Sequence, residues 1–372
     1  MGQTQRKMGS GQIRFMAPER GVNQLAVNAI LNALWDLWAK VERKPLWQLV
    51  ADMSPKELVR CIDFRYITDV LTPEQALEML KQQQTTKHER MQLAKDSKAV
   101  PAYNTSVGWL GHSDDTVRKL LREATDQGFK HFKLKVGLGQ DVDRKRLGLV
   151  REAVGDEGVL MTDVNQLWDV DIAIEYMSEL LRSNPHLKPW FIEEPTAPDD
   201  VLGHAKIRKA LKQHGCGVAT GEHMNTRVLF KQLLQAEAVD VIQPDACRLA
   251  GVNELLSVML LAAKFDVPIL PHAGGAGMVE LCSHLSTIDF VVVSGKKSVL
   301  EYTDHLHEAF EAPAKITSDG YHETPTTPGY SCDVKEAEFE KYEFPDGSFW
   351  KTDQGLKMAN DPWRGCYGEQ TS

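Results

Sequence analysis

Cysteine is sparse in this sequence and never occurs in closely spaced pairs. Because there is no CxxC motif, neither a disulfide framework nor a structural zinc site is indicated. We therefore expect reduced thiols, most of them buried. The six cysteines are Cys61, Cys216, Cys247, Cys282, Cys332 and Cys366.

Long apolar runs and an excess of basic residues are also missing. No segment approaches the roughly 20 apolar residues that a membrane helix needs, so no membrane partner is expected. A net charge of -9 offers no basic surface to a phosphate backbone, which argues against nucleic acid as a partner. These absences predict a soluble intracellular protein.

The location within the cell has two interpretations, cytoplasmic or mitochondrial. The first fourteen residues carry Arg6, Lys7 and Arg14 with no acidic residue among them, as a mitochondrial transit peptide does. The stretch is short and barely amphipathic, which favours a disordered or truncated start instead.

The N-terminal quarter has helical patterning. Residues 22–38 repeat apolar side chains at intervals of three and four, which predicts a helix with a wide buried face anchored by Trp35 and Trp38. Residues 82–98 are polar and predict a solvated connector or an exposed helix.

From about residue 100, short apolar runs alternate with helical stretches of ten or more residues. This alternation is typical of βαβ units and a parallel sheet, and so of the α/β class. The eight expected strands lie at 100–107, 131–137, 159–166, 190–195, 217–223, 240–248, 267–275 and 289–295.

Eight strands are the number that a (β/α)8 TIM barrel requires. A doubly wound open sheet would also alternate strands and helices, but no GxGxxG motif follows an early strand. The barrel is therefore favoured. The glycine-rich HAGGAG at 272–277 would suit a phosphate, although that signal is weak without the rest of a motif.

Successive expected strands each end in an ionisable residue. The intervals from Lys135 to Glu301 are 23 to 30 residues, about one strand and one helix each. In a barrel these groups would meet at the carboxyl-terminal mouth, where barrel enzymes carry their chemistry. A single acid there could equally be a helix cap, but seven positions in register favour a site. The series is Lys133 with Lys135, Asp163, Glu193 with Glu194, Glu222, Asp245, His272 and Glu301.

Three of these groups, Asp163, Glu193 and Glu222, are carboxylates from adjacent strands. They would repel one another unless a cation neutralises them, and oxygen ligands suit Mg²⁺. Zinc would prefer imidazole or thiolate ligands. Because neighbouring strand residues face opposite ways, we expect His223 to point away from Glu222.

Two candidate bases come from other strands. Lys133 and Lys135 share one face of their strand, and their mutual repulsion is expected to lower the pKa of both. The alternative for such a pair is a solvated strand edge. His272 and Asp245 end neighbouring strands, so the carboxylate can orient the imidazole across the mouth from the lysines.

Seven motifs occur in an order that resembles the mandelate racemase group of the enolase superfamily: KLKVG, TDVNQ, WFIEEP, TGEH, IQPDACR, LPHAGG and LEYTDH. The resemblance covers roughly residues 11–352. Within this group, the sequence is most similar to the L-fuconate dehydratases. The resemblance implies a modified TIM barrel at 99–310. It also implies a partial, mainly helical capping region at 1–98 and a C-terminal segment at 311–372 that packs back on both.

The resemblance also implies a chemistry. It indicates Mg²⁺-dependent dehydration of L-fuconate to 2-keto-3-deoxy-L-fuconate through an enediolate, in a homo-oligomer. Lys135 and His272 would be the acid/base pair with Asp245 beside the histidine, and Mg²⁺ would be held by Asp163, Glu193 and Glu222. The expected substrate contacts are Lys133, Asn165, Glu222, His272, Ala273, Gly274 and Glu301.

Two features depart from the family pattern. No segment before residue 22 predicts the β-meander of the capping domain, so we expect an incomplete lid. Leu167 stands where the family pattern indicates an arginine. These departures leave two alternatives open, an acid-sugar racemase or epimerase and a catalytically inactive variant that acts by binding.

Overall fold

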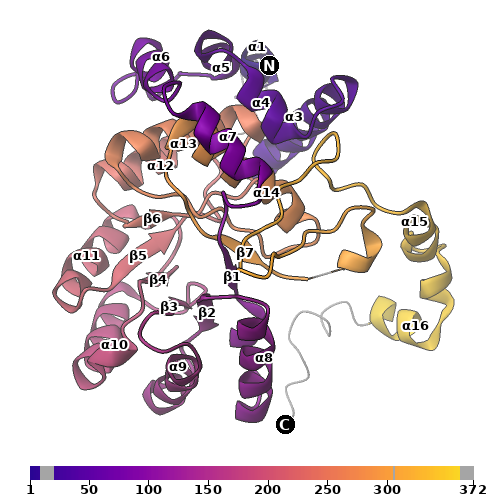
Figure 1. Ribbon diagram of the computed structural model, residues 1–372. Coiled ribbons are helices and arrows are strands. Elements are labelled where there is room, and N and C mark those ends of the chain that lie inside the picture. Colours follow the sequence, from indigo (N-terminus) through magenta and orange to yellow (C-terminus); the bar gives the residue numbers. More distant parts are fainter. Residues whose placement is uncertain (9–20, 305, 361–372) are drawn as a thin grey trace.

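The computed structural model describes residues 1–8, 21–304 and 306–360. A curled parallel sheet lies inside a layer of helices, and a group of N-terminal helices covers one end of that layer (Figure 1). The strands are β1 (Ala102–Asn104), β2 (His131–Lys135), β3 (Val159–Asp163), β4 (Phe191–Glu193), β5 (Gly217–Thr220), β6 (Val241–Ile242) and β7 (Leu300–Tyr302).

The α-helices fall into three groups along the chain. The N-terminal group is α1 (Gly2–Met8), α3 (Val22–Val41), α4 (Leu46–Asp52), α5 (Pro55–Cys61), α6 (Pro73–Gln82) and α7 (Lys87–Lys95). The helices around the sheet are α8 (Asp114–Asp126), α9 (Gln140–Val154), α10 (Val170–Ser183), α11 (Val201–Leu211), α12 (Arg227–Gln235), α13 (Gly251–Phe265) and α14 (Met278–Ile288). The C-terminal pair is α15 (Glu336–Tyr342) and α16 (Asp353–Asn360).

Shorter helical turns connect these elements: η1 (Ser106–Gly108), η2 (Pro185–Leu187), η3 (Lys212–His214), η4 (Asp289–Val293), η5 (His307–Ala309) and η6 (Ser348–Lys351). Of these, η4 is a π-helix, and the others are 3-10 helices.

The sheet confirms the predicted α/β class and the barrel-like curl. Its strands are all parallel and follow the order β6-β5-β4-β3-β2-β1-β7. Beyond β6, residues 267–275 continue the curl through single bridges at Ile269 and His272, not through a regular strand. The result is a curled half-barrel whose strand ends point to a common mouth.

The expected strand at 289–295 is wrong. Residues Asp289–Val293 form the π-helix η4, and the last strand is β7. All five residues of η4 are buried, so their apolar run matches a buried helix as well as a buried strand. Arg90 of α7 fixes this turn by donating from Nε and Nη2 to the carbonyl oxygen of Val291, at 3.2 and 3.0 Å.

The helix expected at 22–38 is present as α3, but only one of its two tryptophans is buried. Trp35 is fully buried and donates from Nε1 to Asn253 Oδ1 of α13 at 2.7 Å, whereas Trp38 remains 36% exposed. The side of α3 that faces solvent is itself apolar and includes Val22, Leu37 and Val41. The helix is therefore less deeply buried than its patterning predicts.

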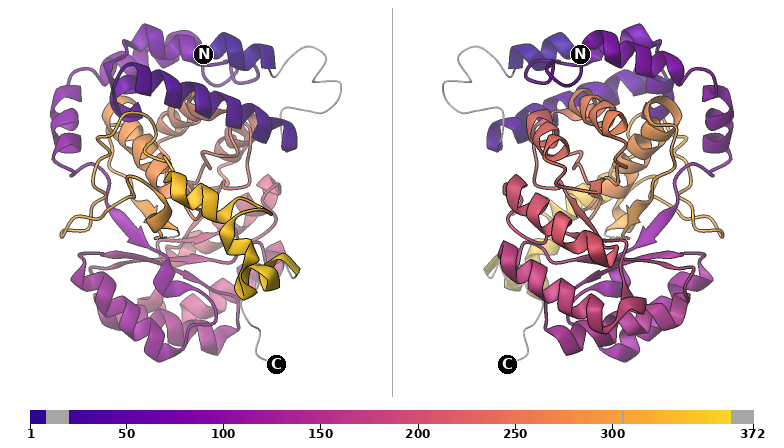
Figure 2. Two further views of the ribbon diagram at one scale, coloured as in Figure 1. Left: turned by 90° about the vertical axis from the view of Figure 1, so that its right-hand side faces the viewer. Right: turned by 90° about the vertical axis from the view of Figure 1, so that its left-hand side faces the viewer.

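The chain beyond β7 returns to the N-terminal helices, as the two side views show (Figure 2). The Tyr330 hydroxyl donates to Asn32 Oδ1 at 2.9 Å, and the Tyr330 amide donates to Asp36 Oδ1 at 2.8 Å. These contacts join α3 to residues nearly 300 positions later.

The other sequence expectations concern the thiols and the membrane. Cys61, Cys216, Cys247, Cys282 and Cys332 are free thiols, of which Cys247 is exposed. Arg14, Cys366 and the last twelve residues lie outside the described part of the chain. Among the described helices, none has both the length and the apolarity to cross a bilayer.

Candidate active site

The register of three neighbouring strands brings the predicted residues into a row. Lys135 of β2 lies opposite Asp163 of β3, and Asp163 lies opposite Glu193 of β4. Each is the last residue of its strand, so all three side chains emerge at the carboxyl-terminal mouth.

A cavity of about 190 Å³ opens at this mouth. Among the residues expected to bind metal, bind substrate or act in catalysis, the cavity is lined by Lys133, Lys135, Asn165, Glu222, His272, Gly274 and Glu301. Asp163, Glu193, Asp245 and Ala273 contact these residues from behind. The structure thus brings the whole predicted set together.

Three further residues line the cavity that sequence reasoning missed: Thr105, Trp109 and Thr303. Thr105 and Thr303 follow directly after β1 and β7, so the strand-end rule that found the acids applies to them too. No sequence pattern singles out Trp109.

Lys133 is buried among carboxylates, and the expected lowering of its pKa is wrong. The side chain is 2% exposed, and its Nζ lies 2.9 Å from Glu193 Oε2, 3.5 Å from Glu301 Oε1 and 3.7 Å from Asp163 Oδ2. Burial opposes the charge, but the three acids outweigh it and hold the pKa of Lys133 well above its usual range. Lys133 is therefore a fixed cation.

Lys135 occupies a different environment on the same face of β2. Its side chain is 24% exposed, lines the cavity and contacts Asp163 Oδ2 through Nζ. Lys135 is thus the more accessible of the two lysines that line the cavity, and its Nζ is held by Asp163.

On the other side of the cavity, His272 and Asp245 form the expected contact. The imidazole Nδ1 donates to Asp245 Oδ2 at 2.8 Å, and Nε2 lies 3.5 Å from Glu222 Oε2. Burial opposes protonation of His272, but the hydrogen bond to Asp245 and the charges of Glu222 and Glu301 raise its pKa to about 9. The imidazole is therefore cationic at neutral pH.

His223 does not point away from the site as expected. Its Nε2 lies 3.0 Å from Glu222 Oε1 and 3.7 Å from Glu194 Oε1. Glu222 follows β5 by two residues, so the strict alternation of a strand no longer applies there. Burial acts to raise the pKa of Glu222, but the hydrogen bond to His223 and the charge of His272 lower it to about 2.

Two carboxylate oxygens in this region lack a hydrogen-bond partner in the described part of the chain. Glu193 Oε1 and Glu194 Oε1 are both buried, and neither has a hydrogen bond among the described residues. Burial and the neighbouring Asp163 charge raise the pKa of Glu193 to about 8, while burial and Glu222 raise that of Glu194 to about 7. Unpartnered oxygens in an excess of acid fit a bound divalent cation.

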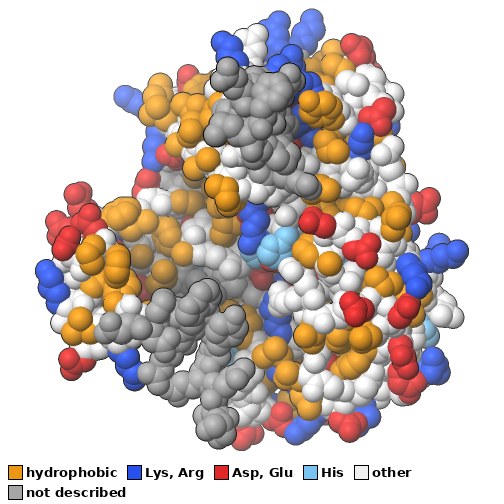
Figure 3. All heavy atoms as spheres, turned by 180° about the vertical axis from the view of Figure 1, so that it is seen from behind, with side chains coloured by type: hydrophobic (Ala, Val, Ile, Leu, Met, Phe, Trp, Pro, Cys, Tyr) orange, Lys and Arg blue, Asp and Glu red, His pale blue; other side chains and the backbone are white. Residues whose placement is uncertain are grey.

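Two candidate sets of ligands share Glu222, but among the described residues only the second has its ligand atoms gathered closely enough to hold such a cation together. One is the predicted triad with Asp163 and Glu193, whose oxygens are in contact with Lys133 and Lys135. The other joins Glu222 to Glu194 and His223, whose ligand atoms lie within 4.8 Å of one another. On the face seen in Figure 3, histidine, basic and acidic side chains gather near the centre of the molecule.

Comparison with known proteins assigns the chain to a family. Residues 116–338 match the family model for the enolase C-terminal domain-like fold. The chain belongs to the enolase superfamily. It is 54% identical over 358 residues to L-galactonate dehydratase of Hypocrea jecorina, a match that covers 95% of this chain and 78% of that relative.

Other superfamily members agree in sequence and in structure. Human mitochondrial enolase superfamily member 1 is 51% identical, covering 92% of this chain and 76% of the relative. Its crystal structure superposes with a TM-score of 0.88 and covers 93% of this chain and 78% of that one. A mutant of L-talarate/galactarate dehydratase liganded with Mg and L-glucarate has a TM-score of 0.64 at 29% identity, covering 86% and 66%.

Proposed function

We propose that this superfamily member is a magnesium-dependent sugar-acid dehydratase acting on a six-carbon aldonic acid of L-galacto configuration. The sequence resemblance indicates L-fuconate, and the name of the 54% identical relative favours L-galactonate as a second candidate. The two acids differ only at C6, where L-galactonate carries a hydroxyl group. The observation that carries the proposal is one cavity lined by both Lys135 and His272, with Asp245 bonded to the histidine from behind.

Dehydration needs a base for the proton on C2 and an acid for the hydroxyl group on C3. Lys135 in its amine form takes the C2 proton. His272, held by Asp245, gives a proton to the C3 hydroxyl, which leaves as water, and the enol product tautomerises to the 2-keto-3-deoxy acid. The two groups are separated around the sheet by the strands from β3 to β6, so a substrate between them meets one on each side.

The remaining residues bind and orient. We assign Asp163, Glu193 and Glu222 as the Mg²⁺ ligands; when bound, the ion stabilises the negative charge that develops on the substrate carboxylate. Lys133 contributes a fixed positive charge. Asn165, Gly274 and Glu301 line the cavity, and Ala273 contributes its backbone amide, which donates to Glu301 Oε2 at 3.1 Å.

The central test is Lys135→Ala, measured as 2-keto-3-deoxy acid formed from L-fuconate and L-galactonate with Mg²⁺. We expect turnover to fall by about 10³-fold or more, while Mg²⁺ still binds in calorimetry. Lys130→Ala is the matched control, because Lys130 is exposed at the start of the same strand region. Turnover retained in Lys135→Ala would overturn the assignment.

The same assay separates the other functions. Exchange of the C2 proton with solvent deuterium, without release of a keto acid, would identify a racemase or epimerase. Tight Mg²⁺ binding with no turnover of any sugar acid would identify a catalytically inactive protein that acts by binding. The ratio of kcat/KM for L-galactonate to that for L-fuconate shows whether the cavity favours or disfavours a hydroxyl group at C6.

The metal ligands are tested by paired variants. If the predicted triad binds Mg²⁺, Glu193→Gln weakens Mg²⁺ binding by about tenfold or more, and His223→Gln leaves it nearly unchanged. The opposite pattern would assign the ion to Glu194, Glu222 and His223.

We also propose that the protein is a homo-oligomer located in the cytoplasm or the mitochondrion. Sedimentation checks the oligomeric state, and cell fractionation checks the location.

A further inference from the structure

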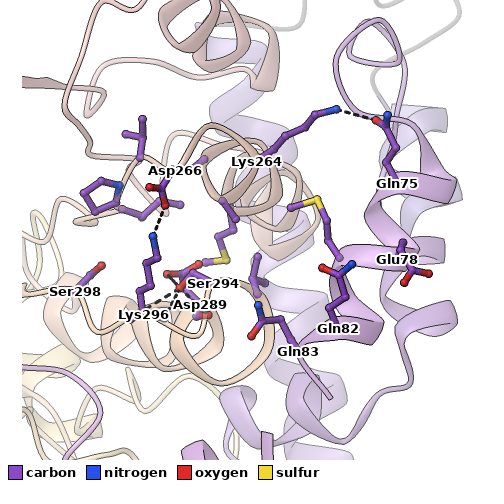
Figure 4. Close-up of a pocket in the computed structure, with 18 residues that line it drawn as sticks. Gln75, Glu78, Gln82, Gln83, Lys264, Asp266, Asp289, Ser294, Lys296 and Ser298 are labelled. Atoms are coloured by element: carbon purple, nitrogen blue, oxygen red, sulfur yellow. Dashed lines mark hydrogen bonds and ion pairs between the residues drawn. The ribbon is translucent and has the colours of Figure 1, made fainter. Parts of the chain in front are cut away.

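A second cavity, of about 650 Å³, lies between α6, the end of α13 and the π-helix η4 (Figure 4). It is separate from the candidate active site. Residues 267–269 and Ser298 line it, whereas His272 and Glu301, further along the same two segments, line the catalytic cavity. The second cavity is therefore at the amino ends of these segments.

The walls of this cavity are largely apolar. They are formed by Met79 of α6, Met259, Ala262 and Ala263 of α13, Val267 and Ile269 of the following segment, and Val293 of η4. Such walls suit a hydrocarbon body, and methionine side chains adapt to its shape. Gln75, Gln82 and Gln83 add amide groups from α6 and its C-terminal end.

The polar group that stands out is Asp289, which is 4% exposed and lines the cavity. Its Oδ2 accepts a hydrogen bond from Ser294 Oγ at 2.8 Å, but its Oδ1 is buried and has no hydrogen-bond partner in the described part of the chain. A buried carboxylate oxygen without a partner is costly, so a donor that reached it from the cavity would relieve that cost.

The basic side chains around the cavity are engaged elsewhere. Lys296 pairs with Asp266, and both side chains are well exposed. Lys264 donates to the carbonyl oxygen of Val70 and to Gln75 Oε1, the latter at 2.9 Å. Between residues 21 and 304, no ion pair to Asp289 is formed, so the cavity has an acid without a counter-ion.

We propose that this cavity binds a small organic cation, an alkyl- or arylammonium whose amine pairs with Asp289 while its hydrocarbon part contacts the methionine and alanine walls. A carboxylate ligand would place a second negative charge beside Asp289. A neutral alcohol would satisfy Oδ1 without the ionic attraction. The chemistry therefore ranks amine above alcohol and alcohol above carboxylate.

The position of Asp289 within a π-helix agrees with this use. Wide turns of this kind are rare and occur frequently at functional sites. Arg90 holds the turn by hydrogen bonding to the Val291 carbonyl, and Gly295 beyond the turn adopts φ +70° close to Gln83. The backbone that carries Asp289 is thus held in place by hydrogen bonds from Arg90.

The test uses the full chain with saturating Mg²⁺ at pH 8 and three probes of equal length: 4-phenylbutylamine, 4-phenylbutan-1-ol and 4-phenylbutanoate. Dissociation constants come from saturation-transfer NMR titrations. We expect the amine to bind about tenfold or more tightly than either of the others, because charge-assisted hydrogen bonds are the stronger ones.

Three variants locate the binding. Asp289→Asn is expected to weaken amine binding about tenfold, and Ala263→Phe, which fills the cavity from the α13 wall, is expected to abolish it. Asp266→Asn removes an exposed carboxylate at the rim and should leave the affinity unchanged. Unchanged amine affinity in Asp289→Asn, or in Ala263→Phe, would overturn the proposal. If Asp289→Asn fails to fold, Ala263→Phe still decides it.

Discussion

At the scale of single residues, Gly274 lies where a side chain would enter the catalytic cavity. A Cβ at this position would lie 3.0 Å from His272 Nε2 and 3.6 Å from Glu301 Oε2. We expect Gly274→Ala to lower kcat/KM by about tenfold or more with little change in melting temperature, because a small displacement of an acid/base group is costly.

The control is Gly275→Ala, whose Cβ would approach only the flexible Met278 side chain, at 3.0 Å from its Cγ. We expect nearly normal kinetics from this variant. Equal losses in both variants would mean that the loop as a whole, and not the space beside His272, limits the reaction.

The positions of site residues could be predicted from the sequence wherever they follow from the regular spacing and alternation of a strand. The row formed by Lys135, Asp163 and Glu193 follows from equal strand spacing, and the structure places all three side by side. The pKa of Lys133 did not follow, because it depends on carboxylates from three other strands. His223 was misplaced for a related reason, since the alternation ends with β5 at Thr220.

At the scale of elements, we expect the π-helix η4 to make stability depend on pH through Asp289. Burial raises the pKa of Asp289 to about 7, from 3.8 in the unfolded chain. Between these values the folded protein holds a proton that the unfolded chain has lost, so stability falls as the pH rises, by up to about 1.4 kcal/mol per unit.

We therefore expect Asp289→Asn to lose less stability than the unmodified protein between pH 5 and 7, measured by urea unfolding. Asp266→Asn, which changes an exposed carboxylate, should follow the unmodified protein. Parallel pH profiles for the Asp289→Asn variant and the unmodified protein would show that the buried carboxyl is ionised throughout.

The same element shows why strand prediction failed at 289–295. A short apolar run bounded by polar residues reads equally as a buried strand or a buried turn of helix, and only Arg90 and the neighbouring helices decide between them. By contrast, β2, β3 and β4 each end in a charged residue, at a spacing that a buried helix would not repeat so regularly.

At the scale of the whole molecule, the alternation of strands and helices was enough to predict an α/β barrel-like architecture. The return of the C-terminal segment to α3 was expected only from resemblance, since the Tyr330 contacts to Asn32 and Asp36 join positions that no local pattern relates. Cavities are similarly non-local. The cavity beside Asp289 is assembled from α6, α13 and η4, so it had no sequence signature.

Two buried histidines that join distant parts of the chain predict how the whole molecule responds to acid. His284 accepts from the Trp47 amide at 3.3 Å, and His322 contacts the Leu300 carbonyl oxygen at 3.1 Å. Burial lowers the pKa of His284 to about 3 and that of His322 to about 4, from 6.5 in the unfolded chain.

Below pH 6.5 the unfolded chain therefore binds protons that the folded protein excludes, and each histidine costs up to about 1.4 kcal/mol of stability per pH unit. The two histidines therefore give the free energy of unfolding a downward slope as the pH falls from 6.5 to 4.5, which the opposite effect of Asp289 partly offsets. His322→Gln should reduce that slope, whereas His88→Gln, at an exposed position on α7, should not. A slope unchanged in His322→Gln would mean that this imidazole takes up its proton without unfolding the protein.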